Sequence, residues 1–111
     1  MRGSVEKRRE SAVLSQARRL LEMRNGHCYK TGGLGEPDLI CCQAGVSIVV
    51  ECKQPGEKPK PLQRLRLQEW ALAGALAFWF DGTWHRIGFD GREIPGSVPP
   101  IVTEIEKNAD A

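Results

Sequence analysis

Two apolar runs joined by a very short turn constrain the fold of this chain more than any other feature. Residues 38–43 and 46–53 read as strands, and Gln43-Ala44-Gly45 between them is short enough for a β-hairpin. This pairing sets Asp38, at the start of the first strand, beside the Glu51-x-Lys53 sequence that ends the second. Pro37 agrees with that position, because a residue without an N–H belongs at a strand start or edge.

The charged residues at this strand end predict a particular chemistry. Glu51 and Lys53 are two residues apart and point to one face of the strand, whereas Cys52 points to the other. Two carboxylates without His or Cys ligands form a hard oxygen site that suits Mg²⁺ or Mn²⁺. Such an ion activates a bound water and neutralises charge on a phosphate, and a nearby lysine orients that water. The residues therefore predict phosphodiester hydrolysis.

A plainer interpretation of the same residues stays open. Glu51 and Lys53 would then be the solvated end of a strand, or a surface salt bridge of little energetic worth, in a small structural or interaction protein.

The distribution of charge favours a polyanionic partner. The net charge is only +2, but residues 1–30 hold eight Lys/Arg against three Glu, and residues 53–66 hold five against one. Basic segments thus flank the acidic site, which suits a polyanionic substrate. The arginines of the first segment could equally solvate one face of a helix.

The length of 111 residues predicts one domain over 1–111, with a core over about 8–88 and a loosely held C-terminal tail over 89–111. The chain lacks a long apolar run and has a polar amino terminus, so we expect no membrane span, no signal peptide and a cytoplasmic location. That location disfavours disulfides. The four cysteines lack metal-ligand spacing and are interpreted as small apolar strand residues, and His27 and His85 are not expected to bind metal.

Local patterns predict the remaining elements. A helix is expected over 8–24, with an apolar face and a stop at Asn25-Gly26, and a short strand over 27–31. A basic, Pro-punctuated loop follows Lys53, and a second helix is expected over 62–73. A last hairpin surrounds Asp81-Gly82. The hairpin is rich in aromatic residues, which are interpreted either as core or as a self-complementary dimer patch; they are Phe78, Trp79, Phe80 and Trp84.

This order resembles the PD-(D/E)XK nuclease superfamily, and most closely the virus-type replication-repair nuclease (VRR-NUC) family in its minimal stand-alone form. The matching features are Glu10 on the first helix, Gly35-x-Pro37-Asp38, Glu51-x-Lys53, and Pro61-Leu62-Gln63 followed by Gly74. The resemblance implies an α/β fold, a restriction-endonuclease-like core with a central mixed β-sheet flanked by helices in α-β-β-β-α-β-β order. One departure is Glu36, where the family usually has a small apolar residue.

The resemblance also implies roles for these residues. Asp38, Glu51 and the main-chain carbonyl of Cys52 would bind Mg²⁺, for which Mn²⁺ would substitute, and Glu10 would join them, through water or a second ion. Lys53 would position or activate the attacking water, and Gln63 would hold the scissile phosphate or a metal-bound water. Contacts to DNA are expected from four basic residues, Lys30, Lys58, Lys60 and Arg64.

The activity implied is that of a metal-dependent, structure-selective DNA endonuclease of phage or bacterial host cells. By resemblance to Holliday junction resolvases, it would act as a homodimer on branched or four-way DNA. The alternative is a nucleic-acid-binding module or a nuclease subunit without independent cleavage activity.

Overall fold

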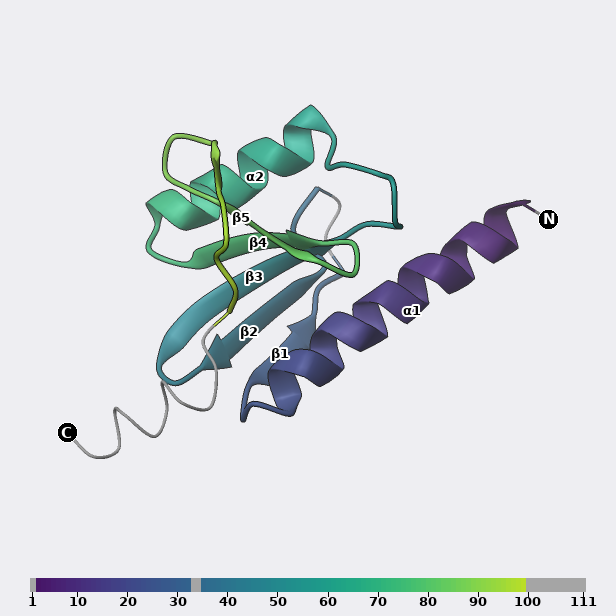
Figure 1. The fold of residues 1–111 in the computed structure, drawn as a ribbon, viewed down its shortest axis with the longest axis horizontal. Coiled ribbons are helices and arrows are strands. Elements are labelled where there is room, and N and C mark those ends of the chain that lie inside the picture. Colours follow the sequence, from purple (N-terminus) through teal and green to yellow (C-terminus); the bar gives the residue numbers. More distant parts are fainter. Residues whose placement is uncertain (1, 33–34, 100–111) are drawn as a thin grey trace.

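The computed structural model describes residues 2–32 and 35–99, with side chains described from residue 11 onward. Two helices and six strands follow one another along this described part of the chain (Figure 1). They are α1 (Arg2–Glu22), β1 (His27–Lys30), β2 (Leu39–Gln43), β3 (Val46–Cys52), α2 (Pro61–Leu72), β4 (Leu76–Phe80), β5 (Trp84–Ile87) and β6 (Glu93–Ile94).

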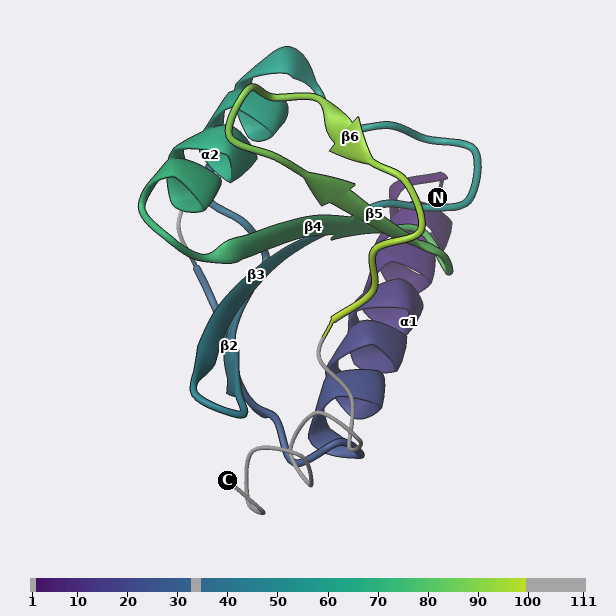
Figure 2. The ribbon, with the colours of Figure 1, turned by 60° about the vertical axis from the view of Figure 1, so that its left-hand side comes forward.

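The strands form one sheet in the order β1-β2-β3-β4-β5-β6. Strands β3 and β4 are parallel, and every other neighbouring pair is antiparallel. The helix α2 makes the crossover between the two parallel strands. The helices cover opposite faces, because α1 packs against β1, β2 and β3 whereas α2 packs against β3, β4 and β5 (Figures 1 and 2). The expected mixed sheet flanked by helices is confirmed, with β6 added to the expected order.

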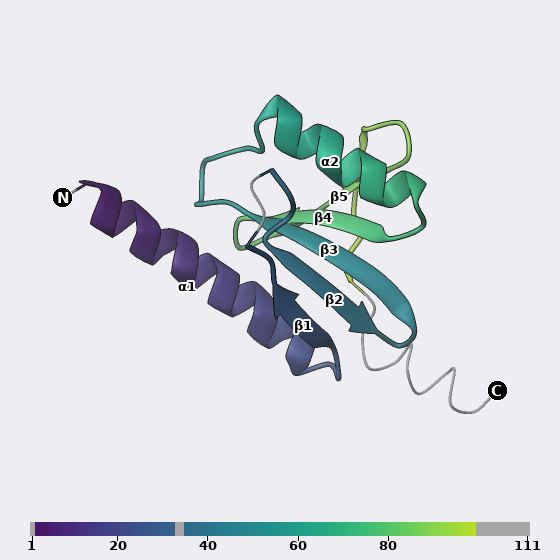
Figure 3. The same ribbon diagram turned by 180° about the vertical axis from the view of Figure 1, so that it is seen from behind.

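The predicted hairpin of β2 and β3 forms with a two-residue turn (Figure 3). Ala44 and Gly45 both have positive φ, 53° and 78°, as the tightest hairpin turns require at their two central positions. Gln43 pairs with Val46, and the ladder runs from there to Leu39 opposite Val50. The turn therefore fixes which residues of β2 and β3 meet at the far end of the hairpin.

Each face of the sheet has its own core. The α1 side buries residues of the helix and of the four strands β1 to β4; the members are Val13, Ala17, Leu21, Cys28, Leu39, Cys41, Ile48, Val50, Cys52, Phe78 and Phe80. The α2 side buries a smaller set, Val49, Leu67, Ala71, Ala77, Trp79 and Ile87. Alternate residues of β3 serve the two sides, as the two-residue period of a strand requires.

The aromatic hairpin belongs to the core. Phe78 and Phe80 are fully buried, Trp79 is 4% exposed, and Trp84 packs edge-on against Phe78 at 5.6 Å between ring centroids. The interpretation of these rings as a dimer patch is therefore wrong, because they already fill the two faces of the sheet.

Helix α1 is longer than expected and buries a narrower stripe. It begins at Arg2 instead of near residue 8, and its buried positions are Val13, Ala17 and Leu21. Met23, which falls within the expected helix, lies beyond its end and is 67% exposed. Asn25, with φ of 64°, ends the helix as predicted.

Part of the expected tail is ordered. Glu93 and Ile94 pair with Ile87 and Arg86 as strand β6 (Figure 2). Helix α2 holds the preceding turn, because the Arg64 guanidinium donates to the Gly91 carbonyl at 3.2 Å. The expected tail over 89–111 thus includes one short strand, and its residues 100–111 lie outside the described part of the chain.

Over the described residues, neither helix combines the length and the apolar composition that a membrane span needs.

Candidate functional site

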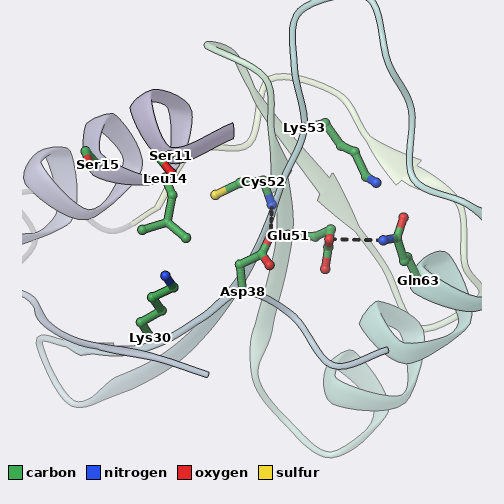
Figure 4. Close-up of a pocket in the computed structure, with 9 residues that line it drawn as sticks. All are labelled: Ser11, Leu14, Ser15, Lys30, Asp38, Glu51, Cys52, Lys53 and Gln63. Carbon is green, nitrogen blue, oxygen red and sulfur yellow. Dashed lines mark hydrogen bonds between the residues drawn. The ribbon is translucent and has the colours of Figure 1, made fainter. Parts of the chain in front are cut away.

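A pocket of about 470 Å³ opens where β3 ends, between α1 and the first turn of α2 (Figure 4). Most of its lining comes from the elements that the hairpin and the crossover bring together. The lining residues are Ser11, Leu14 and Ser15 of α1, Lys30 of β1, Asp38 just before β2, Glu51 and Cys52 of β3, Lys53 just after it, and Gln63 of α2. The carboxyl end of an internal strand next to a helix amino terminus is a common place for a ligand site in α/β proteins.

Asp38 and Glu51 meet because of the hairpin register. The β2–β3 ladder ends with Leu39 opposite Val50, and the same register continued by one residue sets Asp38 opposite Glu51. Side chains directly opposite each other in an antiparallel pair have Cβ atoms roughly 5 Å apart. Both carboxylates line the pocket. The structure thus brings together the two acidic residues singled out in the sequence.

The Asp38 carboxylate is fixed by the backbone of β3. Its Oδ2 accepts the N–H of Cys52 at 2.8 Å, which replaces the ladder bond that β2 no longer supplies there (Figure 4). The peptide around it is held as well, because Thr31 donates its N–H to the Asp38 carbonyl at 2.9 Å and its hydroxyl to the Pro37 carbonyl. Pro37 itself is buried.

Glu51 and Lys53 are buried at the end of β3, with exposed fractions of 5% and 9%. Gln63 donates from Nε2 to Oε1 of Glu51 at 3.2 Å. The Lys53 backbone N–H donates to the Phe80 carbonyl at 2.8 Å, so the backbone of Lys53 still follows β4. This burial excludes the interpretation of the two residues as a solvated strand end.

The pKa of the Cys52 thiol responds to the negative charge of the site. Burial, and after it the negative charges of Asp38 and Glu51, raise the pKa of the Cys52 thiol. The thiol therefore stays protonated at neutral pH and is a poor ligand for a soft metal ion. Its Sγ faces the α1 side, opposite to the side on which Gln63 approaches Glu51 (Figure 4).

The other predicted residues are divided between pocket and surface. Lys30 lines the pocket, whereas Lys58 and Lys60 are exposed in the loop that follows Lys53. Arg64 lies outside the pocket, bound to the Gly91 carbonyl. Glu10 lies in α1 one residue before the pocket-lining Ser11, and its side chain is outside the described part.

Three pocket residues of α1 were missed in the sequence. Ser11, Leu14 and Ser15 have the three- and four-residue spacing of one helix face, which is a signal for a shared surface. Nothing local indicates that this surface turns toward the end of β3, because the angle of α1 is set by its packing on the sheet.

The donors fit the ion that the residue types predict. Two carboxylates with neighbouring main-chain oxygen atoms are the hard donors that Mg²⁺ and Mn²⁺ prefer, and magnesium sites in phosphate-processing proteins often use only one or two carboxylates. Among the side chains described, no group of three or more His, Cys, Asp or Glu converges. The two described carboxylates suit an ion that also binds water and substrate.

Neither histidine approaches this pocket. His85 lies between the carboxylates of Asp81 and Glu93, at 3.2 and 3.1 Å, and stacks on Trp79, while His27 is exposed on β1.

Comparison with solved structures supports the resemblance at the level of fold. One structure described as a VRR_NUC domain superposes with a TM-score of 0.57, covering 92% of this chain and 95% of that chain at 23% sequence identity. No family model matches the sequence, and a search of curated proteins found no match. The chain therefore has the fold of a VRR-NUC domain, and the restriction-endonuclease-like core expected from the sequence is confirmed.

Proposed function

We propose that this protein is a divalent-metal-dependent DNA endonuclease that hydrolyses phosphodiester bonds and prefers branched DNA of the Holliday junction type. The observation that carries the proposal is the meeting of Asp38 and Glu51 in one pocket with Lys53, Lys30 and Gln63. The shared fold with a VRR_NUC domain structure supports a nuclease over other phosphate-binding functions.

In this proposal Asp38 and Glu51 hold Mg²⁺ or Mn²⁺, with the Cys52 carbonyl as a further ligand and Glu10 joining through water. When bound, the ion supplies an acidic water and neutralises charge on the phosphate. Hydrogen bonds from the protein already hold both carboxylates in place for that role. The Cys52 N–H fixes Asp38 at 2.8 Å, and the Gln63 amide fixes Glu51 at 3.2 Å. Neither carboxylate then has to be ordered when the ion arrives.

Lysines supply the positive charge that the reaction needs. Lys53 is buried in the pocket beside Glu51, where its ammonium can orient the attacking water or stabilise charge that develops on the phosphate. Lys30 enters the pocket from β1 and is placed to contact the adjacent phosphate. Lys58 and Lys60 are exposed in the loop beyond Lys53 and would extend the contact along the DNA backbone.

A homodimer that presents two pockets to a branched substrate remains part of the proposal. Its contact surface cannot be the aromatic hairpin, which is core. The exposed leucines of α2, namely Leu62, Leu65 and Leu72, are apolar surface that a second copy could cover.

The test is a cleavage panel on the purified protein with Mg²⁺, Mn²⁺ or a chelator. A four-way junction, a flap and a plain duplex of the same sequence serve as substrates. We expect cutting of the junction that requires the ion and that falls by roughly 100-fold or more in Asp38→Asn, Glu51→Gln and Lys53→Met. Matched controls are Asp90→Asn and Glu57→Gln, which change exposed carboxylates outside the pocket and should cut normally.

Equal cutting by Glu51→Gln and Glu57→Gln would refute the assignment of the site. Junction binding without cleavage at any divalent ion would instead favour the nucleic-acid-binding module or inactive subunit.

A further inference from the structure

Two buried cysteines face each other on the edge of the sheet, away from the pocket lining. Cys28 of β1 and Cys41 of β2 are cross-strand partners, and their sulfur atoms lie 2.7 Å apart. Their exposed fractions are only 4% and 3%. Both are free thiols in this structure. The separation exceeds a disulfide bond length of about 2.05 Å by less than 1 Å.

The register places this pair where a cross-strand disulfide can form. Thr31 donates its N–H to the carbonyl of Asp38, its partner in the same register, so this is a hydrogen-bonded pair of the ladder. Hydrogen-bonded and non-hydrogen-bonded pairs alternate in an antiparallel ladder. Cys28 and Cys41 are therefore a non-hydrogen-bonded pair, whose Cα atoms are typically about 4.5 Å apart. That value lies within the range of about 4.4–6.8 Å that disulfides require.

We propose that Cys28 and Cys41 are a reversible redox pair, which a small disulfide oxidant such as oxidised glutathione converts to a β1–β2 disulfide. The Cys28 thiolate attacks one glutathione sulfur, forms a mixed disulfide and releases one glutathione thiolate. The Cys41 thiolate then attacks the Cys28 sulfur and releases the second glutathione. The two cysteine sulfurs lose two electrons to the oxidant, and their two protons go to the released glutathione thiolates. A dithiol reductant reverses both steps.

The surroundings of the two thiols indicate which of them attacks the oxidant first. Burial raises the pKa of both thiols, but the hydrogen bond that Cys41 donates to Cys28 lowers the pKa of Cys28 and raises that of Cys41; the charges of Glu22 and Arg18 act on Cys28 in opposite directions. Arg18 lies close because its guanidinium donates to the Cys28 carbonyl at 3.4 Å. Cys28 is therefore the first of the pair to become a thiolate, and the nucleophile is the thiolate form.

Access comes from the edge position of β1. Among the residues that the structure describes, this strand has a neighbour on one side only, since β1 ends the strand order. Local opening of a short edge strand exposes the pair without unfolding the central strands. Reversible pairs of this kind are the usual form of disulfide in a reducing compartment, so the proposal agrees with the cytoplasmic location expected from the sequence.

Closure of the disulfide would clamp the segment that carries two pocket residues. The chain between the two cysteines includes Lys30 and Asp38, and the cross-link shortens the unfolded loop that contains them. The oxidised protein should therefore melt at a higher temperature than the reduced protein, by roughly 5 °C or more for a domain of this size.

The experiment needs no nuclease assay, so it stands apart from the proposed function. The folded protein is treated with oxidised glutathione, remaining thiols are alkylated, and trypsin cleaves after Lys30 to separate Cys28 from Cys41. We expect a peptide pair linked through these two sulfurs, lost after dithiothreitol, and a raised melting temperature that reduction reverses. Cys42→Ser is the matched control, because Cys42 is the neighbouring exposed thiol; this variant should form the same link.

Recovery of Cys28 and Cys41 as alkylated or singly glutathionylated thiols in both proteins would overturn the proposal. A link from Cys28 to another cysteine, or a cross-linked protein with no rise in melting temperature, would overturn it as well.

Discussion

Gln63 donates a hydrogen bond from Nε2 to Oε1 of Glu51, at 3.2 Å, from the first turn of α2 to the end of β3 (Figure 4). The other end of the same amide accepts the backbone N–H of Lys60 at 2.9 Å, just before the helix begins. One side chain thus orients a buried carboxylate and satisfies a backbone donor at a helix start. The orientation of the amide is determined, because only its nitrogen can donate to Glu51.

Gln63→Glu should make folding stability depend on pH in a way that the wild type does not. The new carboxylate can still accept the Lys60 N–H, but it faces Glu51 with like charge, which raises the pKa of the pair. A carboxyl group whose pKa is raised in the folded state stabilises at low pH and loses that contribution as the pH rises through the folded value. The variant should match the wild type near pH 4 and be less stable by about 1–3 kcal/mol at pH 7, measured by urea unfolding. Gln16→Glu, at an exposed position of α1, is the control and should follow the wild type at both pH values.

Addition of Mn²⁺ should raise the melting temperature if Asp38 and Glu51 share an ion. At a tenfold excess over Kd, binding to the folded state adds about 1.4 kcal/mol, or roughly 6 °C for a domain of this size. Asp38→Asn keeps an oxygen that can accept the Cys52 N–H, so the fold should survive while the shift disappears. Glu51→Gln should lose the shift too, and Asp90→Asn should keep it. A full shift in Glu51→Gln would show that the ion binds elsewhere.

Phe78→Ala should destabilise the domain severely. Phe78 is fully buried, and loss of a core phenylalanine typically costs about 3–5 kcal/mol. Phe89, which is 68% exposed, offers a matched control, and Phe89→Ala should change stability by about 0.5 kcal/mol or less. The free energies of unfolding come from urea titrations. A small effect of Phe78→Ala together with a change in oligomeric state would restore the interpretation of the hairpin as a dimer surface.

Local sequence signals were sufficient to predict the two hairpins, because each is defined by a short turn. Ala44-Gly45 and Asp81-Gly82 fixed two hairpins, and once the first hairpin was fixed its register brought Asp38 to Glu51. The pairing of two strands joined by a short turn depends on local sequence. Residue types and spacing were therefore enough to predict that Asp38 and Glu51 meet.

The features that the sequence did not predict depend on distant contacts. Strand β6 has two residues, and it exists because β5 offers an edge and Arg64 of α2 holds the turn before it. The same contact ties the Arg64 guanidinium to the Gly91 carbonyl, which the sequence did not indicate. Ser11 and Ser15 reach the pocket only through the angle at which α1 crosses the sheet, which no local pattern records.

Stability of the reduced protein should fall in mildly alkaline solution because of the cysteines of the sheet edge. Burial raises the pKa of Cys28 and Cys41 in the folded state, whereas an unfolded thiol ionises near pH 8.5. Above that pH the unfolded chain binds fewer protons than the folded one, so each thiol lowers stability by up to about 1.4 kcal/mol per pH unit. Urea unfolding between pH 8 and 10, with a reductant present, measures the slope. Cys41→Ala should flatten it relative to the wild type, whereas Cys42→Ala, at the exposed neighbouring position, should leave it unchanged. Parallel curves for all three proteins would mean that burial of Cys41 does not oppose its ionisation, because the buried thiol of Cys52 is common to all three proteins.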